Sequence, residues 1–302
     1  MVTVKIHGAL GNQMFQYALG RALSLKNNTS LRIDPSTTFD ITPWRWRKFV
    51  VANYALSTVF RIDPKMNYVA RFEKTIKIPY FAKALNKYYP RMLGALGYWR
   101  YFQEKRAYIF DPSVFEERGN IYLDGYWQSE KYFKQYDKII RDDFSFRAPL
   151  TGEKAELAEK IMNSESVCFN VRRQEVVNVP SFRDLYFVAD QSFYDRAVSL
   201  IKERVGKDVI FYVVSDDIEW CRKNLRIDGK HVFVGNEYYG TEFRDALHLM
   251  SLCKHFIIPN STFAWWAAWL SLNPEKVVIT PKVWMTDRSD TGDLLPEGWI
   301  KI

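Results

Sequence analysis

The chain has 302 residues, of which 47% are hydrophobic, enough for about two domains with a full-sized core. This composition excludes a disordered or low-complexity protein. The formal net charge is +8. Cys168, Cys221 and Cys253 are odd in number and form no CxxC pair. They therefore exclude a disulfide framework and a cysteine-built zinc site, and they are typical of a reducing compartment.

Neither a signal peptide nor a membrane span is predicted. Residues 1–6 become charged too soon for a signal peptide. The longest apolar stretch, residues 263–272, is about half of the roughly 20 residues that a membrane helix needs. We therefore expect a cytoplasmic protein.

The first half begins with a predicted strand at residues 2–6, a helix at 12–26 and a strand at 31–33. The loop GALGNQ, residues 8–13, joins the first strand to the helix. Glycines let a backbone pass close to a ligand, and a helix start offers free N–H groups to an anion or a sugar hydroxyl. The alternative is an ordinary tight turn, because the loop matches neither GxGxxG nor a phosphate loop with its lysine.

Basic and aromatic residues are interleaved over residues 61–106, which carry 11 Lys and Arg against 3 Asp and Glu. Charged heads beside aromatic bodies suit an interface with anionic lipid. A peripheral membrane surface is one hypothesis for this stretch. A nucleic-acid binder would also be basic, but the excess is confined to one region and no binding signature appears, so we expect no nucleic-acid partner.

The balance of charge changes near residues 147–152, where Pro and Gly punctuate the chain. Residues 1–147 carry 24 basic and 13 acidic side chains, a net +11, whereas residues 148–302 carry 19 and 22, a net −3. We therefore predict one domain over 1–148 and another over 149–302.

The second half alternates short apolar runs with helical patterns, which predicts a parallel sheet with helices on both faces. The predicted strands are 167–171, 209–214, 231–234, 256–258 and 277–279. Such sheets bind ligands at the carboxyl ends of their strands. Three motifs occupy those positions.

The first motif, residues 170–175, contains two adjacent arginines, Arg172 and Arg173, just after a buried strand. Buried charge needs a partner, and the planar guanidinium suits phosphate oxygens. Phosphate binding is one interpretation, and surface arginines paired with Glu or Asp are the other.

The second motif is Ser215-Asp216-Asp217. Its residue types favour an ordinary helix N-cap, and the functional alternative is a group that holds a ribose, a base or a sugar. The chain has no Asp-x-Asp and no His pair at metal-ligand spacing, so we expect no metal. We expect structural roles for His248 and His255.

The third motif, Asn260-Ser261-Thr262, begins a predicted helix that contains Trp265 and Trp266. Hydroxyls and N–H groups converge at this helix start, where a phosphate could dock. Because neighbours on a helix point apart, at least one of the two tryptophans is expected in the core, and the other could line a ligand site.

Together these motifs resemble the bacterial α-1,2-fucosyltransferases of glycosyltransferase family 11. The resemblance rests on GALGNQMFQYA (8–18), SDDIEWC (215–221), MSLCKH (250–255) and NSTFAWW (260–266), and it spans the whole chain. It implies a GT-B fold, in which two Rossmann-like α/β domains face each other across a cleft. Residues 1–148 would form the acceptor side and 149–302 the donor domain.

The resemblance also implies an activity: metal-independent transfer of L-fucose from GDP-fucose, with inversion, to the 2-hydroxyl of a terminal galactose. GDP-fucose would be the substrate, with no cofactor. The acceptor would be an oligosaccharide or a glycolipid precursor at the inner face of the membrane.

One departure leaves alternatives open. The family motif reads His-x-Arg-Arg-Gly-Asp, whereas this chain has Asn170 in place of the histidine and Glu175 in place of the aspartate. A changed donor or linkage, or a non-catalytic carbohydrate- or nucleotide-binding protein, remains open. A nicotinamide-dependent oxidoreductase lacks its glycine fingerprint here.

The predicted site residues fall into three groups. Arg172 and Arg173 would stabilise the departing diphosphate, and Glu175 would be the base. The donor would be held by Asn170, Ser215, Asp216, Asp217, Asn260, Ser261 and Thr262. The acceptor side of the cleft would be bordered by Gly8, Gly11, Asn12 and Gln13.

Overall fold

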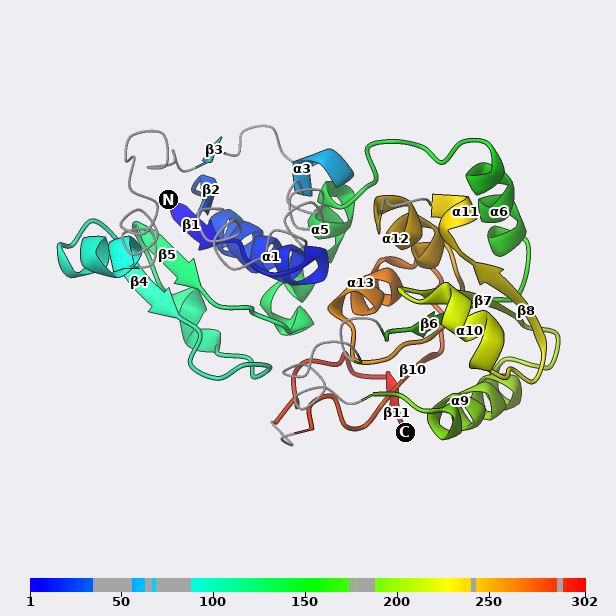
Figure 1. Ribbon diagram of the computed structural model, residues 1–302. Helices are drawn as coiled ribbons and strands as arrows, with labels where there is room; N and C mark the ends of the chain where they lie inside the picture. Colours follow the sequence, from blue (N-terminus) through cyan, green and yellow to red (C-terminus); the bar gives the residue numbers. More distant parts are fainter. Residues whose placement is uncertain are drawn as a thin grey trace. The chain divides into compact units, whose positions relative to one another are not determined.

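The computed structural model describes residues 1–34, 56–62, 67–68, 88–173, 177, 188–239, 243–286 and 290–302. The chain forms two compact units (Figure 1). One comprises Met1–Arg147 and Thr291–Pro296, the other Ala148–Asp290 and Glu297–Ile302.

The segment Thr291–Pro296 departs from the expected division into two uninterrupted ranges. Its Asp293 accepts a hydrogen bond from the backbone N–H of Phe110 at 2.8 Å and pairs with Lys131. These contacts tie the segment to the first unit. No periodicity signals such a return, because it depends on single side chains.

The first unit contains a five-stranded parallel sheet in the order β3-β2-β1-β5-β4. Its strands are β1 (Val2–Lys5), β2 (Leu31–Asp34), β3 (Asn67–Tyr68), β4 (Arg100–Gln103) and β5 (Ile121–Asp124). Its helices and 3-10 turns include α1 (Leu10–Lys26), α3 (Leu56–Val59), η2 (Pro112–Glu116), η3 (Glu130–Tyr132), η4 (Lys134–Tyr136) and α5 (Asp137–Asp143), and residues 88–95 are also helical.

Helix α1 packs on the first sheet and is tied to α5. Tyr17 and Arg21 of α1 both donate to the carboxylate of Asp143, at 2.7 and 2.9 Å. At Gly20 the helix comes so close to the sheet that a Cβ would lie 3.0 Å from Cγ1 of Val4. The close contact at Gly20 therefore fixes the distance between α1 and the sheet, and with it the position of the loop that precedes α1.

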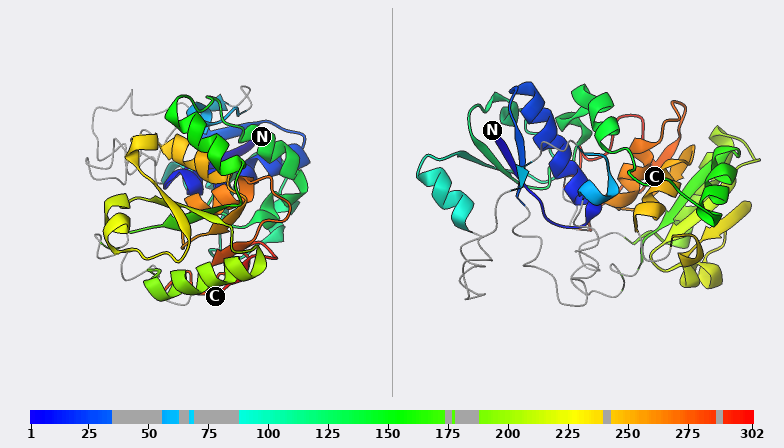
Figure 2. Two further views of the ribbon diagram at one scale, coloured as in Figure 1. Left: turned by 90° about the vertical axis from the view of Figure 1, so that its right-hand side faces the viewer. Right: turned by 90° about the horizontal axis from the view of Figure 1, so that it is seen from above.

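The second unit contains a six-stranded parallel sheet in the order β11-β10-β9-β6-β7-β8 (Figure 2). Its strands are β6 (Ser166–Val171), β7 (Ile210–Ser215), β8 (Lys230–Val234), β9 (His255–Ile257), β10 (Val278–Thr280) and β11 (Ile300–Lys301). The parallel sheet predicted from the apolar runs is confirmed.

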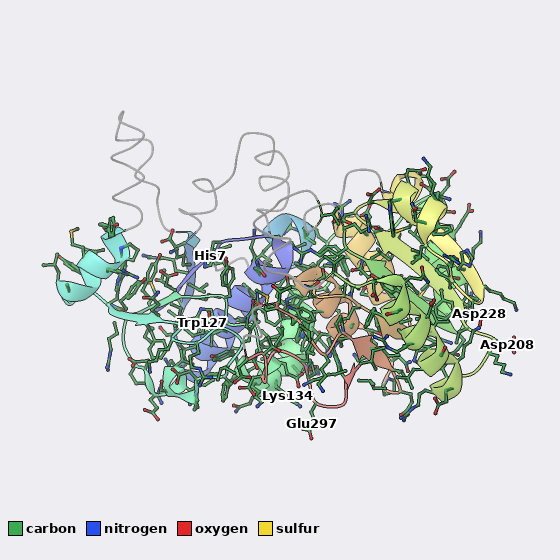
Figure 3. All side chains as sticks on the ribbon, turned by 60° about the horizontal axis from the view of Figure 1, so that its bottom comes forward. His7, Trp127, Lys134, Asp208, Asp228 and Glu297 are labelled. Atoms are coloured by element: carbon green, nitrogen blue, oxygen red, sulfur yellow. The ribbon has the colours of Figure 1, made fainter. Side chains whose placement is uncertain are left out.

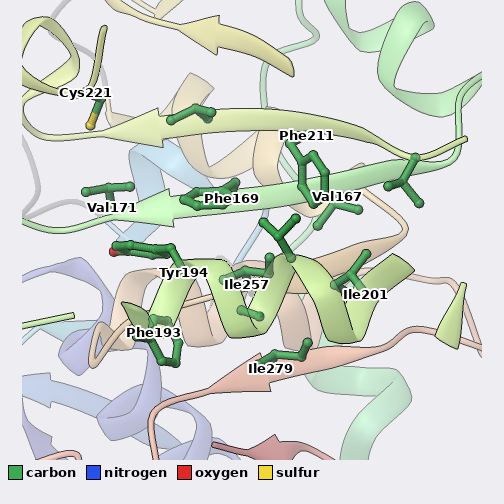
Figure 4. Close-up of a cluster of buried hydrophobic side chains, with 14 of the residues drawn as sticks. Val167, Phe169, Val171, Phe193, Tyr194, Ile201, Phe211, Cys221, Ile257 and Ile279 are labelled. Atoms are coloured by element: carbon green, nitrogen blue, oxygen red, sulfur yellow. The ribbon is translucent and has the colours of Figure 1, made fainter. Parts of the chain in front are cut away.

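Helices cover both faces of this sheet, since all six residues of β6 are buried. The helices are α6 (Glu153–Met162), α9 (Gln191–Arg204), α10 (Ile218–Asn224), α11 (Asn236–Tyr239), α12 (Phe243–Ser251) and α13 (Thr262–Leu270). Helix α9 buries Phe193 and Ile201 in a cluster with Phe169 and Ile257 (Figure 4). Trp265 and Trp266 of α13 are both fully buried, so both belong to the core.

The close approach at Gly20 generates a prediction. Gly20→Ala gains about 1 kcal/mol of helix propensity, but overpacking against Val4 and Leu31, whose Cδ1 would lie 2.9 Å from the new Cβ, costs about 1–3 kcal/mol. We expect a net loss of about 1 kcal/mol in urea unfolding.

Val4→Ala provides the control, because it makes room for the added methyl group. The double variant V4A/G20A should be more stable than the sum of the two single changes predicts. A higher urea midpoint for G20A alone would contradict the packing argument.

Candidate functional site

The first and second motifs of the second unit meet at the carboxyl edge of its sheet. Val171 lies opposite Ser215 in the strand register, so Arg173 and Asp216 leave the sheet as neighbours. The backbone N–H of Arg173 donates to Oδ1 of Asp216 at 2.7 Å. The guanidinium of Arg173 lies 3.5 Å from the centre of the Trp220 ring, a cation–π contact that fixes its plane.

Arg172 connects the first motif to the third. Its Nη1 donates to the backbone carbonyl of Asn260 at 2.8 Å. Ser261 follows directly and caps α13, since its hydroxyl accepts from the N–H of Ala264 at 3.3 Å. The guanidinium is therefore anchored to the residue that precedes the helix cap. Thr262, the first residue of α13, is partly exposed there. A helix start and an arginine side chain both attract anions.

Arg173 also supplies a donor that lacks an acceptor. Its Nε is buried and has no hydrogen-bond partner among the described residues. A buried donor left unpaired costs about 1–3 kcal/mol, which the oxygen of a bound anion would recover. The residues present therefore fit an anionic ligand.

The remaining predicted donor residues have local structural roles. Asp217 caps α10 by accepting from the N–H of Trp220 at 3.2 Å, and the Ser215 hydroxyl accepts from the N–H of Asp217 at 3.0 Å. The N-cap interpretation is thus confirmed. Asn170 is 7% exposed, and its Nδ2 donates to the carbonyl of Val214 at 3.0 Å. This bond joins the ends of β6 and β7.

Glu175, the predicted base, lies outside the described residues. Within the ranges that the structure describes, no three His, Cys, Asp or Glu side chains gather where they could hold a metal ion. Over the same ranges, no helix combines the length and apolar character of a membrane span.

In the first unit, the glycine loop is shaped by its own side chains. Gly8 has φ +78, in the left-handed region, and a Cβ there would lie 2.6 Å from Nδ2 of Asn12. Gln13 donates to the carbonyl of Gly8 at 2.9 Å, and Gln128 donates to Oδ1 of Asn12 at 2.8 Å. Gly11 is buried. The loop is therefore a tight turn whose exposed residues are Gly8 and Ala9, with Asn12 partly exposed.

His7 is a candidate that the sequence analysis missed. It lies two residues after the end of β1 and is labelled in Figure 3. Its ring lies edge-on to that of Tyr126, with centroids 4.5 Å apart. Burial lowers the pKa of His7 to about 4, reinforced by Lys5 and opposed by Asp124. The imidazole is therefore neutral at physiological pH.

Glu104 is the second missed residue, and it follows β4. Its carboxylate accepts from the backbone N–H groups of Tyr126 and Trp127, at 2.7 and 3.0 Å, and burial raises its pKa. Trp127 has φ +58, a costly conformation for a bulky residue, which these two bonds help to hold. His7 is the first polar residue after the predicted strand at 2–6 and could have been found there, whereas Glu104 follows β4, a strand that the sequence analysis did not predict.

The other two histidines considered from sequence lie in the second unit. His255 uses both ring nitrogens: Nε2 contacts Oε1 of Glu165 at 2.8 Å, and Nδ1 accepts from the N–H of Val277 at 3.0 Å. Its structural role is confirmed. Burial lowers the pKa of His248.

The pKa of His7 predicts a pH dependence of stability. Between its ordinary pKa of 6.5 and the folded value of about 4, the unfolded chain binds one more proton than the folded chain. The free energy of unfolding should therefore fall, by up to about 3 kcal/mol, as pH drops through this window. The stability difference between wild type and His7→Gln should shrink accordingly in urea titrations.

His231→Gln, which removes an exposed histidine, is the matched control for that series. Parallel stability curves for wild type and H7Q from pH 7 to pH 4 would show that the His7 ring is not held neutral by the fold.

Comparisons with known proteins identify the family to which the chain belongs. The model of the family described as Glycosyl transferase family 11 matches residues 1–302. An alpha-1,2-colitosyltransferase of Escherichia coli is 31% identical, covering 100% of this chain and 99% of the relative. A galactoside 2-alpha-L-fucosyltransferase, Sec1 of Mus musculus, is 26% identical, covering 90% of this chain and 64% of the relative.

Among solved structures, the fucosyltransferase NodZ from Bradyrhizobium has a similar fold. The TM-score is 0.50 at 12% sequence identity, covering 88% of this chain and 90% of NodZ. With a parallel α/β sheet in each unit, the GT-B fold class is confirmed. The chain belongs to glycosyltransferase family 11 and is a glycosyltransferase that uses a nucleotide sugar.

Proposed function

We propose that this enzyme transfers L-fucose from GDP-fucose to the 2-hydroxyl of a terminal galactose, with inversion and without a metal. The observation that carries the proposal is the anion site at the carboxyl edge of the second sheet. There Arg172 is anchored beside the start of α13, and the buried Nε of Arg173 has no partner among the residues that the structure describes. Such a site suits the diphosphate of a nucleotide sugar.

The linkage has support from the relatives. The E. coli colitosyltransferase and a rat relative named as a galactoside alpha-(1,2)-fucosyltransferase both carry the α-1,2 linkage in their names. Their sugars differ, since colitose is fucose without the 3-hydroxyl. A colitose donor is therefore the second candidate, favoured by the 31% identity over the full length of the chain.

In the proposed reaction, the acceptor oxygen attacks the anomeric carbon while the bond from that carbon to the diphosphate oxygen breaks. GDP leaves with added negative charge, and the acceptor hydroxyl gives its proton to a base. Arg172, Arg173 and the N–H groups at Thr262 would stabilise the leaving charge. We assign the base to Glu175, which follows the arginines in the chain.

Asn170 does not titrate, so it takes no part in proton transfer in this proposal. Its bond to Val214 instead holds the strand end from which Arg172 and Arg173 emerge. Ser215, Asp216 and Asp217 would shape the donor site through the loop and cap contacts they make.

The acceptor would be a galactose-terminated oligosaccharide or a glycolipid precursor. We assign it to the carboxyl edge of the first sheet, where the exposed backbone at Gly8 and the polar groups of Asn12, His7 and Glu104 gather. The neutral imidazole of His7, the amide of Asn12 and the carboxylate of Glu104 can each form hydrogen bonds with sugar hydroxyls.

A donor screen tests the proposal. A ligand at a hundred times its Kd stabilises a protein by about 2.7 kcal/mol, a rise in Tm of several degrees. We expect this rise with GDP-fucose and a smaller one with GDP-mannose or UDP-galactose. Incubation with a β-galactoside should release GDP and give an α-1,2-linked product by NMR.

The same screen separates the alternatives. Stronger stabilisation and faster transfer with GDP-colitose would assign the second candidate. Donor binding without GDP release would identify a non-catalytic nucleotide-binding protein, and preference for a uridine nucleotide would contradict the proposal.

Arg172→Lys tests the role of the anchored guanidinium. Lysine keeps the charge but cannot both bond the Asn260 carbonyl and fork toward a phosphate. We expect kcat to fall by about 10²–10³ with little change in Tm. Arg196→Lys, an exposed arginine on α9, is the matched control and should be near wild type. A near-native kcat for R172K would contradict this role.

A further inference from the structure

A shallow pocket of about 570 Å³ opens in the first unit, at the amino ends of β4 and β5. Three arginines and three aromatic side chains dominate its lining: Arg91, Arg100, Arg118, Tyr98, Trp99 and Tyr101. No carboxylate is among the described residues that line it. The carboxyl ends of the same two strands carry Glu104 and Tyr126, so this pocket is distinct from the proposed acceptor edge.

The arginines of the pocket have few acidic partners. Arg100 pairs with Glu117 at 2.8 Å, although its own side chain is 70% exposed. Arg91 donates to neutral oxygens of Tyr101 and Gln103, and Arg118 donates only to backbone carbonyls. Two of the three guanidinium charges are therefore available to an anion.

An apolar ridge borders the pocket. Tyr88, Met92 and Leu96 are spaced four residues apart along the helical residues 88–95 and the turn that follows, so they share one face. They are 56%, 47% and 65% exposed, and Tyr98 is 65% exposed. These four are half of the eight exposed large hydrophobic side chains in the described part of the chain.

The ridge and the arginines form one surface, the 88–118 patch, defined by Tyr88, Arg91, Met92, Leu96, Tyr98, Arg100 and Arg118. It corresponds to part of the stretch 61–106 for which a lipid interface is one hypothesis from the sequence; residues 63–66 and 69–87 of that stretch lie outside the described residues. The neighbouring carboxylates among the described residues include Glu116, which is exposed, and Glu117, which pairs with Arg100. Asp124, which accepts from the Tyr101 hydroxyl, is near enough to contribute to the raised pKa of Arg91.

We propose that the 88–118 patch docks on the surface of an anionic phospholipid bilayer. The guanidinium groups bind headgroup phosphates, chiefly through Arg91 and Arg118, which form no ion pair with a described carboxylate. The side chains of Leu96, Met92 and Tyr98 enter the interfacial layer. A single weak signal gives only marginal attachment, whereas charge and apolar insertion together give stable binding. The inference does not depend on the identity of the sugar donor.

Sedimentation of the full chain with vesicles tests the patch. We expect binding to vesicles of phosphatidylcholine mixed with phosphatidylglycerol at physiological salt. Vesicles of phosphatidylcholine alone should bind weakly, and high salt should weaken binding to the mixed vesicles. Each basic residue near an anionic surface strengthens binding about fivefold, so R91E/R118E should bind at least about tenfold more weakly.

The matched control is K207E/K223E, which makes the same change in net charge at two exposed lysines of the second unit and should bind like wild type. L96S/Y98S tests the apolar half of the patch at exposed positions, where folding should be preserved, and it should also lose binding. All variants are compared at an unchanged thermal unfolding midpoint.

Three results would overturn the proposal. Wild type could fail to sediment with the mixed vesicles, or K207E/K223E could lose as much binding as R91E/R118E. The third is saturable binding of glycerol phosphate by wild type, abolished in R91E/R118E, without any vesicle binding; the pocket would then be a site for a soluble phosphate.

Discussion

The bond between the Arg172 guanidinium and the Asn260 carbonyl is the contact on which the proposed chemistry depends. It ties the loop after β6 to the residue that precedes the cap of α13. A parallel sheet makes this possible, because it brings the ends of distant strands to one edge. One N–H group of the Arg172 guanidinium is used in this bond, which fixes the position of the side chain. A fixed donor needs no reorganisation when charge develops on a leaving group.

Arg173 is held differently, and the contrast is informative. Its backbone is bonded to Asp216, its guanidinium plane lies against Trp220, and its Nε lacks a partner in the described part of the chain. The backbone and the ring thus fix its position, whereas Nε is left for an acceptor. Asp216 accepts from the Arg173 main chain through Oδ1, so this bond helps to position the arginine without occupying Nε. Arg172 is therefore anchored through its guanidinium, whereas Arg173 is anchored through its backbone and its ring contact and keeps Nε for the ligand.

Sequence patterns were sufficient for five of the six strands of the second unit's sheet, because buried parallel strands are continuous apolar runs. The two-residue edge strand β11 was not predicted, since it is too short to form such a run. The run at 167–171 and strand β6 (Ser166–Val171) differ by one residue. Sequence patterns were also sufficient for the helix starts at Asp217 and Ser261, since capping depends on residue type and local position. They could not show that Asn170 bonds to Val214 or that Arg173 lies on Trp220. Those contacts join segments more than 40 residues apart in the chain, and no spacing rule encodes them. His7 and Glu104 were missed because strand β4 was not predicted, and because only the strand order brings each of them into contact with Tyr126.

Net charge is a poor guide to where this protein would bind a phosphate. The first 147 residues have a net charge of +11 and the remainder −3, yet the proposed donor site lies in the acidic part. There two arginines and the start of a helix favour an anion locally, although residues 148–302 have a negative net charge. The polar carboxyl edge of the first unit instead contains a neutral histidine and a buried carboxylate, Glu104. Three of that unit's arginines lie at the opposite ends of β4 and β5, around an apolar ridge. These arginines lie away from the proposed sugar site and beside exposed apolar side chains. This combination is expected of a surface that binds anionic lipid.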